Sequence, residues 1–84
     1  MVMSEQLLKA AVRAEELQDI IRRKIEIRLG VGGLYVSVGD PAVRAHTNVI
    51  TFLELQTYSA NGLLADAIES CVRRGDQTLK SHGS

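Results

Sequence analysis

Aromatic residues and cysteine are both scarce in this chain of 84 residues. It contains two tyrosines, one phenylalanine and no tryptophan. A core with so few aromatic side chains is built mainly from Leu, Ile, Val and Ala, which suits helices packed closely on one another or on a small sheet. The one cysteine, Cys71, cannot form an internal disulfide, so the sequence predicts a cytoplasmic protein.

A surplus of charge and a long apolar run are also lacking. Ten basic side chains balance ten acidic ones, and bulk electrostatics therefore give nucleic-acid binding no support. No apolar run reaches the roughly 18 residues that a membrane span needs, and the first residues lack the basic start and long apolar stretch of a signal peptide. We therefore expect a protein that does not associate with membranes.

The length predicts one small domain. Chains of this size bury only roughly 60% of their unfolded surface on folding, and they often complete their core by oligomerising. We therefore expect a homodimer. The composition predicts a single domain over residues 1–75 and a flexible, polar C-terminal tail over residues 76–84.

Two kinds of periodicity divide the first half of the chain. Over residues 5–23 apolar side chains recur three and four residues apart, which predicts an amphipathic helix. From Lys24 the period changes to two, first in KIEIRL and again in LYVSVG. Such alternation is typical of half-buried strands.

The glycines between these two runs predict a β-hairpin. Pairing Leu29 with Leu34 sets a single register, in which Arg28 lies opposite Tyr35 on the outer face. The loop then has four residues, or two when Gly30 pairs with Gly33, and the glycines supply the positive φ of the turn. The inner face in this register consists of Ile25, Ile27, Leu29, Leu34, Val36 and Val38.

The segment after the hairpin is open to two interpretations. Asp40 followed by Pro41 is typical of a helix start and favours a second helix, whereas the β-branched residues of TNVITF leave a third strand at about residues 47–55 as the alternative. A last helix follows, which Ser59 or Asn61 caps and Gly75 ends. The sequence thus predicts an α+β fold in the order α-β-β-α-α, with α-β-β-β-α as the alternative.

Catalytic and cofactor-binding motifs are not found in the sequence. The stretch GVGGLYV lacks the lysine and the following helix of a phosphate-binding loop. Cys71 lies in an apolar helical stripe, where a free cysteine is usually a small buried hydrophobe rather than a nucleophile. His46, His82 and Cys71 lack the spacing of metal ligands. We therefore expect no enzymatic activity, no cofactor and no metal.

One cluster of side chains is a candidate contact site for a partner. Basic residues gather where the first helix meets the hairpin, and an aromatic residue lies beside them: Arg22, Arg23, Lys24, Arg28 and Tyr35. The simplest interpretation is a solvated strand face with Arg28 stacked on Tyr35. The alternative is a surface that binds a protein or a phosphate backbone. We interpret the chain as a small non-enzymatic protein-binding module of the adaptor, inhibitor or regulator kind.

The layout of the hairpin resembles that of a known family. In KIEIRLGVGGLYVSVGDPAV, residues 24–43, a hairpin with a glycine-containing turn leads into a further helix, as in the Phd/YefM antitoxins. The sequence lacks that family's N-terminal strand and the acidic-aromatic motif of its second helix. The resemblance implies a DNA-binding transcriptional regulator or antitoxin as the alternative function, and it assigns no functional residue.

Overall fold

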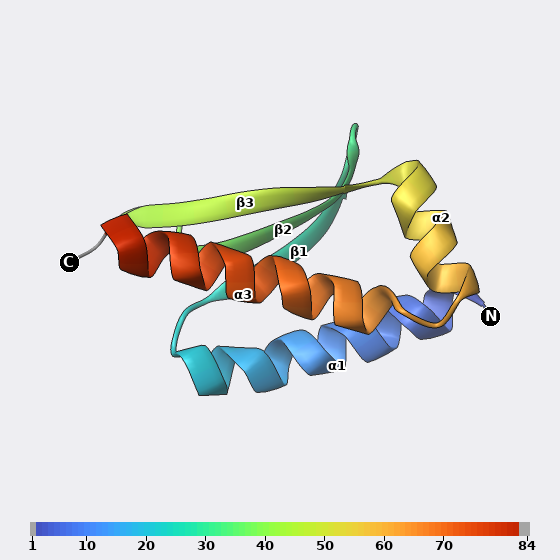
Figure 1. Ribbon diagram of the computed structural model, residues 1–84, viewed down its shortest axis with the longest axis horizontal. Helices are drawn as coiled ribbons and strands as arrows, with labels where there is room; N and C mark the ends of the chain where they lie inside the picture. The colour runs from blue at the N-terminus through green and yellow to red at the C-terminus, as the bar shows by residue number, and fades with distance from the viewer. Residues whose placement is uncertain (1, 83–84) are drawn as a thin grey trace.

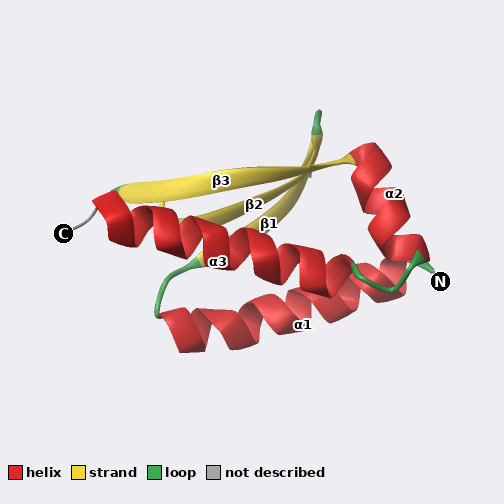
Figure 2. Cartoon of the chain, in the orientation of Figure 1, coloured by secondary structure: helices red, strands yellow, loops and turns green. Residues whose placement is uncertain are grey.

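The fold places two long helices against one face of a small sheet. The computed structural model describes residues 2–82. Its elements are α1 (Met3–Ile21), β1 (Ile25–Gly30), β2 (Gly33–Asp40), β3 (Arg44–Thr51), α2 (Phe52–Ala60) and α3 (Leu64–His82). The strands form an antiparallel sheet in the order β1-β2-β3. α1 and α3 lie side by side beneath it, and α2 stands at one end (Figures 1 and 2). The predicted α+β class is confirmed.

The predicted hairpin register is confirmed pair for pair. Leu29 lies opposite Leu34, and Gly30 opposite Gly33, so the turn has only two residues. The positive φ expected in the turn lies instead at Gly33, where φ is 139°. A Cβ atom at this position would collide with the carbonyl oxygen of Ile50 on β3. Gly33 therefore allows the third strand to approach the second.

The favoured helix after the hairpin is wrong for residues 44–51, which form β3. A third strand is present, as in the alternative, but it ends at Thr51 and not at residue 55, because residues 52–55 begin α2. The order is therefore α-β-β-β-α-α. Its two adjacent apolar residues point to opposite faces: Ile50 is buried, and Val49 is 40% exposed on the outer face. Asp40 accepts a hydrogen bond from the Ala42 N–H in a turn instead of capping a helix.

The helix α2 begins only at Phe52, where a capping box forms. The Thr51 hydroxyl accepts a hydrogen bond from the Glu54 N–H, and the Glu54 carboxylate accepts one from the Thr51 N–H. Each side chain thus satisfies a backbone group that the first helical turn leaves unpaired. The capping box therefore fixes the point at which the strand ends and the helix begins.

The sequence predicts that the last helix ends at Gly75, but the helix continues to His82. Gly75 lies against β2: a Cβ atom there would be only 3.0 Å from Val38 Cγ2. The glycine therefore permits close packing of helix on sheet. Residues 76–82 of the expected tail are helical, and Leu79 is buried in the core. Residues 83 and 84 of that tail lie outside the described residues.

The core fills the space between the sheet and the two long helices. Its largest fully buried apolar members come from α1, β2 and α3: Leu17, Leu34, Val36, Val38, Leu64, Ile68 and Val72. Leu29, which the sequence places on the inner face, is 60% exposed. Its pair with Leu34 is the second from the two-residue turn, where the hairpin tip projects beyond the helices (Figure 1).

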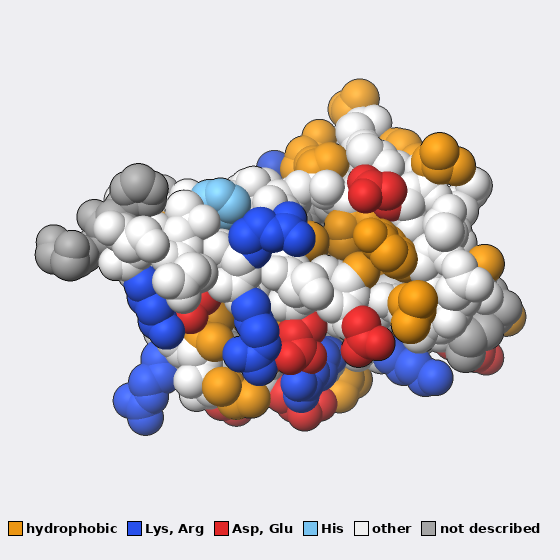
Figure 3. All heavy atoms as spheres, in the orientation of Figure 1, with side chains coloured by type: hydrophobic (Ala, Val, Ile, Leu, Met, Phe, Trp, Pro, Cys, Tyr) orange, Lys and Arg blue, Asp and Glu red, His pale blue; other side chains and the backbone are white. Residues whose placement is uncertain are grey.

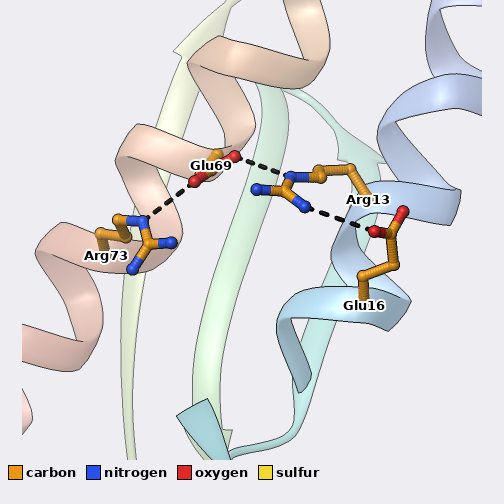
Figure 4. A network of polar contacts seen from close by, with 4 residues as sticks. All are labelled: Arg13, Glu16, Glu69 and Arg73. Carbon is orange, nitrogen blue, oxygen red and sulfur yellow. Dashed lines mark hydrogen bonds and ion pairs between the residues drawn. The ribbon is translucent and has the colours of Figure 1, made fainter. Parts of the chain in front are cut away.

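An ion-pair network joins α1 to α3 (Figure 4). The Glu69 carboxylate accepts hydrogen bonds from Arg13 Nε at 2.7 Å and from Arg73 Nε at 3.0 Å. Arg13 also pairs with Glu16 on its own helix. The hydrogen bonds from Arg13 and then Arg73 hold the pKa of Glu69 below its ordinary value. The network therefore holds α1 against α3 while the Glu69 carboxylate is ionised.

Candidate binding surfaces

One face of the sheet carries no helix within the described part of the chain (Figure 1). Alternate residues of each strand point to this side. We call it the open sheet face, and its side chains are Glu26, Arg28, Tyr35, Ser37, Ala45, Thr47 and Val49. On β2 the outward positions at both ends are glycines, so only Tyr35 and Ser37 project from the central strand. The surface is therefore flat around one aromatic ring.

The two predicted residues on this face, Arg28 and Tyr35, are cross-strand partners. The Arg28 guanidinium carbon lies 5.2 Å from the centroid of the tyrosine ring, within the range of a cation–π contact. The predicted stacking of Arg28 on Tyr35 is thus confirmed. Val49 of β3 lies opposite Tyr35 on the other side. The three side chains form a row across the sheet.

Tyr35 is held by contacts that the sequence analysis missed. Its hydroxyl accepts a 3.2 Å hydrogen bond from the Gly32 N–H in the turn. Its ring covers Gly30, because a Cβ atom there would overlap the ring. Gly30 is a diagonal cross-strand neighbour of Tyr35, and an aromatic ring laid over such a glycine is a known stabilising device in sheets. This diagonal pairing was readable from the register.

The other predicted residues, Arg22, Arg23 and Lys24, lie away from this pair. They border a hollow of about 560 Å³ between the end of α1 and the β2-β3 turn. Lys24 directly precedes β1, and Arg28 lies four residues further along the chain, which in an extended backbone separates them by about 13 Å. The structure thus divides the predicted cluster into two sites. We call the hollow that Arg22, Arg23 and Lys24 border the basic hollow.

A fourth cation, Arg44, completes the basic hollow, and Asp40 lies beside it. Arg44 could not be assigned to this site from the sequence, because a helix and not a strand was favoured for residues 44–51. Arg23 is already paired, since its Nε donates to Asp76 Oδ1 at 2.7 Å. Arg22 has a φ of 59°, a left-handed conformation that costs a non-glycine residue about 1–2 kcal/mol. An arginine is therefore held in a strained position at this rim.

A groove of about 370 Å³ lies between β3, α2 and α3. Apolar side chains such as Ile50, Leu63 and Ala67 line it, with charged ones at its border: Glu54, Asp66 and Arg74. Figure 3 shows apolar side chains gathered on this side of the molecule. We call this hollow the edge groove, because it lies beside the end of β3, an edge strand of the sheet.

Cys71 borders the edge groove but is only 7% exposed. Burial is the main reason why the pKa of its thiol is raised. The charge of Arg74 opposes this rise, and the charge of Glu54 adds to it. A thiol of raised pKa carries less of the nucleophilic thiolate at neutral pH. The Nδ1 atom of His46 lies 3.5 Å from the amide nitrogen of Asn48. The position favours the packing role that the sequence predicts for Cys71.

Residues 2–82 contain no group of three or more His, Cys, Asp or Glu side chains that could hold a metal ion. No helix among them is long and apolar enough to cross a membrane. Comparisons with models of protein families, with curated proteins and with solved structures found no match. The resemblance to the Phd/YefM antitoxins therefore gains no support from them.

Proposed function

We propose that the chain is a small non-enzymatic protein-binding module that acts as a homodimer and contacts its partner through the open sheet face. The observation that carries this proposal is the row of Arg28, Tyr35 and Val49 on a face that no described helix covers. Arginine and tyrosine are enriched among the residues that dominate binding energy at protein interfaces.

The side chains of this row are already fixed in place in the free chain, which favours tight binding of a partner. Tyr35 is fixed by its ring contact with Gly30 and its hydrogen bond from Gly32, and Arg28 stacks on it. Side chains that are already fixed lose less conformational entropy on binding. Next to the row, the Ser37 and Thr47 hydroxyls hydrogen-bond each other at 2.8 Å. The face therefore offers a partner an ordered, flat surface.

An affinity capture from the native host with a mass-spectrometric readout tests the proposal. Arg28→Glu reverses a charge in the row and is expected to weaken capture of the partner about tenfold or more. Lys9→Glu is the matched control, because it reverses an exposed charge on α1, and it is expected to capture the partner like the parent chain. Equal capture by Arg28→Glu and the parent chain would contradict the proposal.

The basic hollow supports a second candidate function, a DNA-binding regulator. Arg22, Lys24 and Arg44 form no ion pair with any residue that the structure describes, and they border one hollow. Unpaired cations at one site are suited to phosphate contacts, which weaken steeply with salt. Retention on heparin that falls with salt and is lost in the double variant Arg22→Ala, Lys24→Ala supports this function. Passage through heparin at low salt excludes it.

A further inference from the structure

The two free edges of the sheet differ in charge. The β1 edge carries Glu26 and Arg28 within the strand, whereas β3 has no charged residue and no proline between Ala45 and Thr51. Charged side chains on an edge strand oppose pairing with another chain, and a long edge without them is a template for pairing. The β3 edge is therefore the side of the sheet that can accept a further strand.

The backbone groups available at this edge follow from the sheet pairing. The Gly39 N–H donates to the Lys24 carbonyl at 2.8 Å, toward β1. Backbone groups alternate between the two sides of a strand, so the odd-numbered residues of β2 bond to β1, as Gly39 does, and the even-numbered residues bond to β3. Their partners on β3 are also even-numbered. The N–H and C=O groups of Ala45, Thr47 and Val49 therefore point to the free edge. The next N–H, that of Thr51, is occupied by Glu54 at 3.1 Å.

These three free residues are symmetric about Thr47. In a second, antiparallel copy, Thr47 lies opposite Thr47, and each Ala45 lies opposite a Val49. We propose that two copies of the chain pair along β3 about a two-fold axis at Thr47, forming one antiparallel sheet with three strands from each copy. This interface deepens the homodimer of the proposed function by naming its surface and register.

Exposed apolar residues flank β3 at both ends. Val43, just before the strand, is 83% exposed, and Phe52, just after it, is 49% exposed. Antiparallel pairing brings the start of one strand beside the end of the other, so each Val43 lies next to the second copy's Phe52. Stable interfaces bury more than about 1,000 Å² in total, and these two apolar contacts extend the interface beyond the paired strands.

The charges at the two ends are also complementary. Arg44 lies opposite the second copy's Ile50 in this register, on the sheet face where Ile50 and Glu54 border the edge groove. Arg44 has no ion pair with any residue in the described range 2–82, and it approaches the second copy's Glu54. In Figure 3 charged side chains gather over the long helices and are sparse along β3. The second copy therefore covers a mainly uncharged strip with a matched charge at each end.

Sedimentation equilibrium of the purified full chain tests the interface. The parent chain is expected to sediment at twice the chain mass. Thr47→Lys places two cations opposite each other across the axis and is expected to raise the dimer Kd about tenfold or more. Glu26→Lys, which adds a lysine to the β1 edge, is the matched control and leaves the dimer intact. A monomeric parent chain at about 1 mM, or an undisturbed dimer in Thr47→Lys, overturns the proposal.

Hydrogen exchange on the parent chain gives a second readout that needs no variant. The amides of Ala45, Thr47 and Val49 are expected to exchange slowly in concentrated solution and faster on dilution. The amides of His46 and Asn48, which bond to β2, are expected to stay protected at both concentrations. Equal exchange of Thr47 at both concentrations contradicts the interface. Loss of partner capture in Arg28→Glu alongside a monomeric parent chain would overturn the interface and leave the proposed binding face standing.

Discussion

Asp76 and Arg23, 53 positions apart in the chain, form a 2.7 Å hydrogen-bonded ion pair. Asp76 lies on α3 with its side chain only 10% exposed, and Arg23 follows the end of α1. Lys80 approaches the same carboxylate at 3.2 Å. The pair ties the loop that leads into the sheet to the last turns of α3. Its carboxylate belongs to the segment that the sequence predicts as a tail.

We predict that Asp76→Asn destabilises the fold. The amide keeps the size of the side chain but lacks the negative charge that attracts Arg23 and Lys80. The loss of this attraction is expected to lower the free energy of unfolding by about 1–2 kcal/mol. Asp66→Asn, on the exposed first turn of the same helix, is the control and is expected to change it by less than about 0.5 kcal/mol. Urea unfolding followed by circular dichroism measures both. Equal stability of Asp76→Asn and the parent chain would refute the structural role of the pair.

Acid is expected to weaken the contacts between α1 and α3. Hydrogen bonds from Arg13 and Arg73 lower the pKa of Glu69. Burial raises the pKa of Asp76, but hydrogen bonds from Arg23 and Lys80 outweigh burial and lower it overall. Since both pKa values are lower in the folded chain, the unfolded chain takes up protons first as the pH falls. The stabilisation is therefore fully present above the ordinary carboxyl pKa values of about 4, and it is lost progressively as the pH falls through the lower pKa values of the folded chain.

This pH dependence can be assigned with one variant. Urea unfolding from pH 7 to pH 3 is expected to show a falling free energy for the parent chain. Glu69→Gln removes one of the two carboxylates, and we expect a shallower fall over the same range. An unchanged slope in Glu69→Gln would show that its ion pairs with Arg13 and Arg73 do not contribute.

Gly33 is expected to be intolerant of a side chain, unlike its neighbour Gly32. Gly33→Ala combines a φ of 139° with a Cβ atom that collides with backbone of β3, and we expect a loss of about 2 kcal/mol or more. A Cβ atom at Gly32 meets only the end of the Tyr35 side chain at 3.0 Å, which can move. Comparison of the two thermal midpoints tests this difference. A Gly32→Ala variant as unstable as Gly33→Ala would contradict it.

Arg22 is expected to lower the stability of the chain. Because its φ of 59° is a conformation that glycine adopts freely, Arg22→Gly is expected to raise the free energy of unfolding by about 0.5–1 kcal/mol. The same variant removes one cation of the basic hollow, so heparin retention, where present, is expected to fall. Thermal unfolding and heparin elution are measured on one preparation. A less stable Arg22→Gly variant would contradict the strain at this residue.

The elements that were predicted correctly are those fixed by local periodicity. The alternation of Ile25, Ile27, Leu34 and Val36 sets the hairpin register without reference to the rest of the chain. The third strand could not be distinguished in this way, because the adjacent Val49 and Ile50 point to opposite faces. Likewise, Gly75 is typical of a helix end, and only the structure shows that it lies within α3, where its lack of a side chain leaves room for Val38.

The same distinction applies to the candidate sites. Arg28 and Tyr35 follow directly from the hairpin register, so their contact was predictable. Arg44 joins Arg22 and Lys24 only because the β2-β3 turn returns the chain to the end of α1. That turn exists only because residues 44–51 form β3, which the sequence predicted only as an alternative. The basic hollow could therefore be predicted in part, and the edge groove could not.

Hydroxyl-radical footprinting of the two tyrosines, with and without the captured partner, tests the central proposal most directly. Both are partly buried, but Tyr35 lies on the open sheet face and Tyr58 borders the edge groove. The chain contains no other tyrosine, so each modification rate can be assigned. We predict that bound partner lowers the oxidation of Tyr35 several-fold and leaves that of Tyr58 unchanged. Protection of Tyr58 with an unchanged rate at Tyr35 would contradict the proposed binding face.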